Sequence, residues 1–211
     1  GYGCIRLVES LNWAPMIEHP KWLIGFSDVT VFHEKLSRLG IASIHGIMPL
    51  GFNEGSVEAI ETLKHALFGA PYFIAGPTCK ENINGQASGE LIGGNLAIVC
   101  SLLGTPLSYD FKDKILFLED VGEHIYKIDR MLYALKLNGV FQQIRGLILG
   151  GFTEMEDTDV PFGKSIKQLV LEQTLTLGIP VAFDFPAGHI QDNRALMFGR
   201  SVTLRVTEAQ S

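Results

Sequence analysis

Short apolar segments alternate with amphipathic helical segments along most of this chain, and this alternation limits the possible folds more than any other feature. Residues 22–26 (WLIGF) and 41–47 (IASIHGI) are apolar runs of strand length. Helical patterns follow them at 28–39 and at 56–68, where Ser56 is a suitable N-cap. Strands separated by helices pair in parallel, so the sequence predicts an α/β fold with a parallel sheet.

A second series of strands and helices follows residue 89. A Gly-Gly-Asn turn leads into an apolar helix, strands are predicted at 114–121, 144–152 and 201–208, and helices at 124–140 and 164–178. Residues 180–190 are predicted to be a strand that enters a loop. Ahead of this series, residues 71–88 are rich in Gly, Pro, Asn and Ser, as in a linker. We therefore expect a first domain in residues 1–70 and a second in residues 89–211.

The beginning of the chain is unusual for a first domain. It opens with GYGCIRL, a glycine-rich turn that runs into a predicted helix at residues 4–13. Such a turn normally follows a strand. We therefore expect this chain to be the C-terminal part of a longer protein, with the N-terminal part of the first domain missing.

The composition excludes several classes of function. The net charge of -6 argues against a nucleic-acid groove. A chain of 211 residues with 46% hydrophobic residues has enough apolar surface for a packed core. No apolar run is long enough for a membrane span, and no signal peptide is predicted. The three widely spaced cysteines (Cys4, Cys79 and Cys100) favour reduced thiols in the cytoplasm. Neither a metal site nor a nucleotide cofactor is predicted, because no paired His and Cys spacing or glycine-rich phosphate motif occurs.

Three polar residues lie at or just after the ends of predicted strands. Ser27 follows WLIGF, Glu119 follows KILFL, and His189 follows PVAFDFPAG. The carboxyl ends of strands in an α/β sheet converge on one crevice. There a serine would be the nucleophile, a histidine its general base, and a carboxylate the group that orients the base.

Each of these residues also has a simpler interpretation. Ser27 could cap the helix that follows it, and His189 could be a loop histidine. Glu119 and Asp120 could be a solvated strand end or a pair of carboxylates that begin a helix. The GFSDV sequence also lacks the second glycine of the G-x-S-x-G elbow found in α/β hydrolases. His45 lies at another strand end and could line the same crevice.

Seven motifs occur in a fixed order: GYGCIRL, LIGFSDVTVFH, HGIMPL, LIGGNLAIVCSLLGTP, ILFLEDVGEHIYKIDRML, RGLILGGF and AGH. Together they resemble the LD-carboxypeptidases, serine peptidases of bacterial cell-wall recycling, a family that also includes the microcin C immunity peptidases. The resemblance extends from Gly1 to about Gly199. It implies a parallel-sheet nucleophile domain, followed by a smaller mixed α/β domain, with the active site between them.

The resemblance also implies roles for individual residues. It makes Ser27, His189 and Glu119 a catalytic triad. It places the oxyanion hole at the backbone amide of Asp28 and at the glycine turn that begins with Gly1. Asn95 and Arg130 are candidates for binding the free carboxylate of the substrate.

The activity implied by the resemblance is hydrolysis of the amide that joins a diamino acid to the terminal D-alanine of a murein tetrapeptide. Two alternatives are a microcin-immunity-type peptidase that cleaves acyl-sulfamoyl adenylates, with Tyr72 or Phe73 stacking on adenine, and a non-catalytic muropeptide-binding protein. The family further implies a homodimer, and an N-terminal segment or second chain that completes the first domain. Without that completion the sheet is expected to have an exposed edge.

Overall fold

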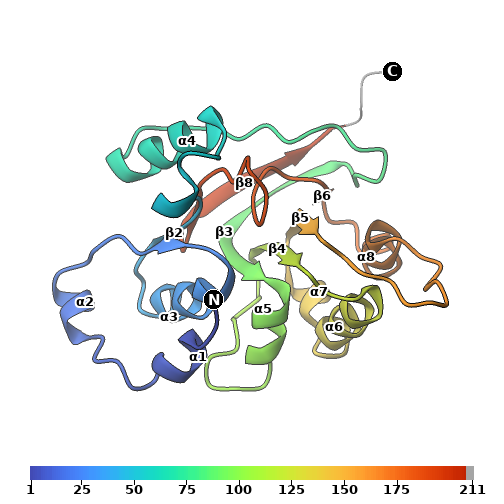
Figure 1. Cartoon of the computed structure of the whole chain (residues 1–211), viewed down its shortest axis with the longest axis horizontal. Coiled ribbons are helices and arrows are strands. Elements are labelled where there is room, and N and C mark those ends of the chain that lie inside the picture. Colours follow the sequence, from blue (N-terminus) through green and yellow to red (C-terminus); the bar gives the residue numbers. More distant parts are fainter. Residues whose placement is uncertain (208–211) are drawn as a thin grey trace.

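The computed structural model describes residues 1–207, which form two sheets in one α/β arrangement (Figure 1). The first sheet has the strand order β1-β2-β7, with β1 at Ile24–Gly25, β2 at Ser43–His45 and β7 at Leu196–Phe198. Strands β1 and β2 are parallel, whereas β7 is antiparallel to β2. Strand β1 lies at one edge of this sheet, and β7 joins it from the far end of the chain.

The first part of the chain also contains six helical segments. They are α1 (Cys4–Leu7), α2 (Ala14–Glu18), η1 (Ser27–Val29), α3 (Thr30–Arg38), η2 (Pro49–Gly51) and α4 (Val57–Phe68). Helix α4 begins as the sequence predicts, because the Ser56 side chain accepts a hydrogen bond from the Ala59 amide. The single helix predicted at residues 4–13 is wrong, since α1 ends at Leu7 and a separate helix, α2, follows.

The second sheet has five strands in the order β6-β5-β4-β3-β8. Their bounds are β3 at Gly85–Asn95, β4 at Ile115–Val121, β5 at Gly146–Thr153, β6 at Val181–Ala182 and β8 at Ser201–Val206. Strands β3 to β6 are parallel, and β8 is antiparallel to β3, which makes the sheet mixed. Within the described residues this sheet has more strands than the first, although the sequence led us to expect the smaller domain here.

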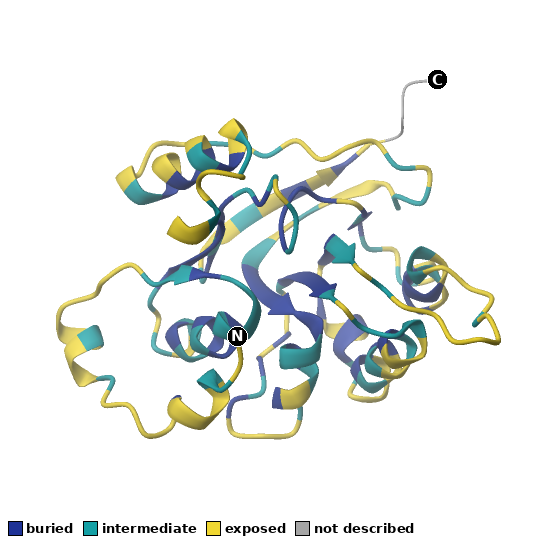
Figure 2. Ribbon diagram, viewed as in Figure 1, coloured by how far each residue is buried: buried dark blue, intermediate teal, exposed yellow. Residues whose placement is uncertain are grey.

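Helices cover one face of the second sheet (Figure 1). These helices are α5 (Leu96–Leu102), α6 (Ile125–Leu137), α7 (Val140–Gln143) and α8 (Ile166–Thr174). Side chains alternate along a strand, so Leu116 and Leu118 of β4 pack under the helices while Ile115 and Phe117 face the opposite core. Figure 2 shows β4 as a buried element at the centre of the molecule.

Strand β3 links the two parts of the chain, and a pair of glycines allows it to do so. Gly93 and Gly94 have φ angles of 122° and 134°. A Cβ on Gly93 would overlap the carbonyl oxygen of Phe117, and one on Gly94 would overlap the Thr30 hydroxyl at the start of α3. Only glycine therefore lets the end of β3 approach both β4 and α3 this closely.

No helix within residues 1–207 is long and apolar enough to cross a membrane.

Replacement of Gly93 by alanine should lower the free energy of unfolding by about 3 kcal/mol or more, because steric overlap with the β4 backbone adds to the unfavourable φ. Gly104→Ala is the matched control: Gly104 also has a positive φ (72°), but a Cβ there would meet nothing within 4 Å. Gly104→Ala should lower the free energy of unfolding by only about 1 kcal/mol. Equal losses in urea denaturation would contradict the packing argument.

Candidate active site

Ser27 lies on a strand-to-helix elbow and does not cap a helix. It lies two residues after the end of β1, has a φ of 65°, and begins the short helix η1 that runs into α3. Neither helix start has a side-chain cap hydrogen bond, which contradicts the N-cap interpretation. A non-glycine residue in the left-handed region is uncommon, and it is typical of a nucleophile elbow.

Gly25 and Val29 account for the absence of the second glycine. A Cβ on Gly25 would lie 3.1 Å from Cγ2 of Val29, so the bare Cα of Gly25 provides the room that the valine side chain fills. The strand and helix still pack closely, with the small residue on the strand side of the elbow. The GFSDV sequence therefore supports an elbow without a glycine two residues after Ser27.

Glu119 and His189 form a close pair beside the second sheet. Nδ1 of His189 lies 2.6 Å from Oε2 of Glu119, and the backbone N–H of His189 donates to the same oxygen at 3.2 Å. The Glu119 side chain is fully buried, whereas 20% of the His189 side chain is exposed. A carboxylate facing Nδ1 holds the N–H tautomer there and leaves Nε2 free to accept a proton.

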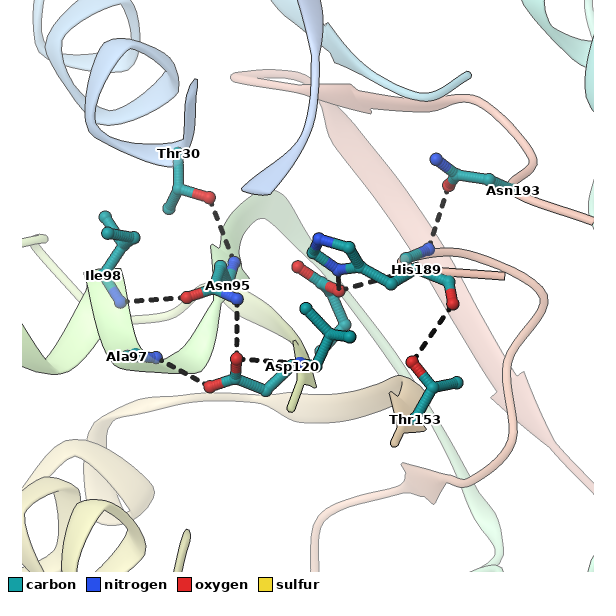
Figure 3. Close-up of polar contacts among 11 residues, drawn as sticks. Thr30, Asn95, Ala97, Ile98, Asp120, Thr153, His189 and Asn193 are labelled. Atoms are coloured by element: carbon teal, nitrogen blue, oxygen red, sulfur yellow. Dashed lines mark hydrogen bonds and ion pairs between the residues drawn. The ribbon is translucent and has the colours of Figure 1, made fainter. Parts of the chain in front are cut away.

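The loop that carries His189 is held at both sides of the histidine (Figure 3). Thr153 donates through Oγ1 to the His189 carbonyl oxygen at 3.2 Å, and the Gly188 amide donates to Oδ1 of Asn193 at 2.9 Å. A Cβ on Gly188, whose φ is 111°, would lie 2.9 Å from Oε2 of Glu119. The Gly-His sequence thus allows the backbone to approach the carboxylate closely.

Phe26 connects the serine elbow to the histidine. Its ring packs edge-on against the His189 ring, with centroids 4.9 Å apart, and it is the residue next to Ser27. Among residues 1–207, the Ser27 side chain has no hydrogen-bond partner, so the structure has no hydrogen bond between Ser27 and His189. Such bonds between catalytic groups often shorten only when substrate is bound.

His45 does not line the crevice as the sequence suggested. It is completely buried, with its ring 4.9 Å from that of Phe117 and 5.5 Å from that of Phe198. Burial pulls the pKa of His45 well below its usual range, and the nearby His33 and His189 act in the same direction. The His45 imidazole is therefore a neutral part of the core.

The two residues expected at the oxyanion hole lie at the elbow and at the beginning of the chain. Asp28 is in η1, and its carboxylate accepts a hydrogen bond from the Cys4 amide at 2.9 Å. This bond holds the first turn of α1 against the elbow. Gly1 is exposed. The role of both backbone amides in binding an oxyanion stays a prediction.

Asn95 and Arg130, the candidates for binding the substrate carboxylate, occupy different environments. Asn95 is 6% exposed and caps α5, because its Oδ1 accepts from the Ile98 amide at 3.1 Å. Arg130 lies on the exposed side of α6, with its guanidinium carbon 5.7 Å from the centre of the Tyr126 ring. Their binding roles stay predictions.

Asp120, next to Glu119, was missed as a separate feature of the sequence. Its Oδ1 accepts from Nδ2 of Asn95 at 2.8 Å, and its Oδ2 accepts from the Ala97 amide at 3.0 Å (Figure 3). Burial raises the pKa of Asp120, and Glu119 adds to that rise, while these hydrogen bonds oppose it. The strand alternation could have revealed it, because Asp120 must face away from Glu119 and toward α5.

No group of three or more His, Cys, Asp or Glu residues in the described part of the chain could hold a metal ion.

The strained elbow makes a stability prediction. Ser27→Gly should be more stable to unfolding than Ser27→Ala by about 0.5–1 kcal/mol, because glycine removes the cost of a Cβ at positive φ. At the exposed Ser88 of β3, Ser88→Gly should be less stable than Ser88→Ala, since glycine weakens a strand. Thermal or urea unfolding measures both. A glycine variant at position 27 that is clearly the less stable would contradict the elbow.

Two models of one protein family match this chain. Residues 1–46 match the LD-carboxypeptidase N-terminal domain, and residues 88–204 match the LD-carboxypeptidase C-terminal domain. A Synechocystis protein is 37% identical over 97% of this chain, and the murein tetrapeptide carboxypeptidase of Pseudomonas aeruginosa is 30% identical, also over 97%. The chain spans about two thirds of the length of these curated relatives, 67% and 69% respectively.

Solved structures give the same result. The muramoyltetrapeptide carboxypeptidase from Oxalobacter formigenes superposes with a TM-score of 0.86 at 31% identity, over 98% of this chain and 73% of that one. The protein MccF, solved with glutamyl sulfamoyl guanosine, has a TM-score of 0.80 at 21% identity, over 97% of this chain and 70% of that one, which shows a shared fold. This chain belongs to the LD-carboxypeptidase family.

Proposed function

We propose that this chain carries the catalytic machinery of a serine carboxypeptidase that releases the terminal D-alanine from murein tetrapeptides. The observation that carries the proposal is the buried Glu119 paired at 2.6 Å with His189, whose ring packs beside the elbow of Ser27. The names of two relatives, a murein tetrapeptide carboxypeptidase and a muramoyltetrapeptide carboxypeptidase, support the choice of substrate.

In the proposed mechanism, Oγ of Ser27 attacks the carbonyl carbon of the scissile amide while Nε2 of His189 takes the hydroxyl proton. Glu119 stabilises the imidazolium that forms. His189 then gives the proton to the leaving nitrogen, and D-alanine departs. Water, activated by the same histidine, hydrolyses the acyl-enzyme and regenerates Ser27.

The proposed oxyanion hole comprises the Asp28 amide and an amide of the turn that begins at Gly1. Each such donor typically contributes about 3–4 kcal/mol to the stabilisation of the transition state. The Cys4 to Asp28 hydrogen bond supports this pairing, because it holds the turn against the elbow. Recognition of the free carboxylate is assigned to Asn95 or Arg130.

The proposal also includes a cellular setting. The three free cysteines support a location in the reducing cytoplasm, where recycled muropeptides would be the substrate. A homodimer and completion of the first domain by a further polypeptide segment rest on the family resemblance. The division into residues 1–70, a linker at 71–88 and residues 89–211 belongs to the same proposal, with β7 crossing back to the first sheet.

The direct test is release of D-alanine from a purified murein tetrapeptide, measured by a coupled D-amino-acid oxidase assay. Ser27→Ala should lower kcat/KM about a thousandfold or more, because it removes the nucleophile. Ser88→Ala is the matched control, since that exposed serine of β3 pairs with Thr203 of the edge strand β8 and its replacement should leave the rate unchanged.

A tetrapeptide with an amidated C-terminus and an acyl-sulfamoyl adenylate are the comparison substrates. The amidated peptide should be hydrolysed at least tenfold more slowly, because its carboxylate is absent. Full activity of Ser27→Ala would refute the nucleophile. Faster cleavage of the adenylate would favour the microcin-immunity alternative, and binding of tetrapeptide without turnover would favour a muropeptide-binding protein.

A further inference from the structure

The proposed nucleophile and its base come from different parts of the chain. Ser27 is on the elbow between β1 and α3, whereas Glu119 is on β4 of the other sheet and holds His189. Proton transfer requires Ser27 Oγ and His189 Nε2 to come within hydrogen-bond distance. The contact between the two parts therefore determines whether the triad can assemble.

The first turn of α3 is joined to the end of β3 at Thr30. Thr30 is fully buried, and its Oγ1 accepts a hydrogen bond from the Asn95 amide at 3.0 Å. The Thr30 carbonyl oxygen lies 3.3 Å from the Tyr109 hydroxyl, which also donates to the Gly93 carbonyl at 3.0 Å. Thr30 is three residues after Ser27, so these bonds hold the same short segment that carries the nucleophile.

The connection continues from Asn95 to the strand that carries the acid. Nδ2 of Asn95 donates to Asp120 at 2.8 Å, and Asp120 is the residue directly after Glu119. Asp120 is 2% exposed and is held further by the backbone amides of Ala97 and Val121. Figure 3 shows Thr30, Asn95 and Asp120 as one line of contacts beside His189.

We propose that Thr30 is a positioning residue for catalysis: its hydroxyl, through Asn95 and Asp120, sets the separation between Ser27 and the Glu119–His189 pair. This inference rests on the proposed function, in which Ser27 is the nucleophile. Thr30 itself is buried and acts through its neighbours.

Two substitutions separate a hydrogen-bonding role from a packing role. Thr30→Val keeps the shape of the side chain and removes the acceptor, which leaves the buried Asn95 amide without its partner. Thr30→Ser keeps the acceptor and removes the methyl group that faces Gly94. If the hydrogen bond of Thr30 positions the nucleophile, Thr30→Val should lower kcat more than Thr30→Ser. If only the packing of its methyl group does so, Thr30→Ser should lower kcat more.

We expect Thr30→Val to lower kcat for D-alanine release about ten- to hundredfold, with KM changed less than about twofold, because a small misplacement of the nucleophile acts on the chemical step. Thr30→Ser should retain kcat within about threefold. Asp120→Asn should resemble the valine variant, since its amide group would face a donor. All assays are done well below the measured unfolding temperature of each variant.

A second readout does not depend on substrate. Hydrogen exchange of the peptide covering residues 91–98 should accelerate about tenfold or more at the Asn95 amide in Thr30→Val, and should stay near wild type in Thr30→Ser. Unchanged kcat in the valine variant, or equal loss in the serine variant, would overturn the inference. A wild-type protein that releases no D-alanine would instead contradict the proposed function. In that case, hydrogen exchange at the Asn95 amide that is equal in Thr30→Val and Thr30→Ser would contradict the inference.

Discussion

The close approach of the first turn of α3 to the end of β3 is the contact on which the site depends. It requires glycine at positions 93 and 94, where any side chain would overlap β4 or Thr30. Once the backbones are this close, the Asn95 amide must find a buried partner, and the Thr30 hydroxyl supplies it. A packing constraint in β3 thereby becomes a constraint on the position of Ser27.

Strand β4 carries two buried carboxylates with different surroundings. Glu119 faces the loop of His189, and its charge is balanced when the histidine becomes protonated. Asp120 faces α5, where two backbone amides and Asn95 donate to it. Successive residues on one strand point to opposite faces. A single strand end can therefore orient the proposed base and, through Asn95, connect to Thr30 of α3.

The proposed triad could be recognised in the sequence because Ser27, Glu119 and His189 each lie at or just after the end of an apolar strand. Other features could not. The first half of β3, GQASGE, has the composition of a linker, and only its pairing with β8 makes it a strand. Strand β7 has three residues and joins β2 from about 150 positions away, a pairing that no local pattern reports. The contacts of Thr30 with Asn95 and Tyr109 depend on the same long-range packing, so they could not be predicted from the sequence either.

The central claim is that Ser27 and His189 act as one catalytic unit. The most direct measurement compares kcat/KM for D-alanine release by Ser27→Ala, His189→Ala and the double variant. Because the serine is inactive without its base, each single loss should equal the double loss within about threefold. A double variant whose loss is the product of the two single losses would show that the residues act independently, and would contradict the triad.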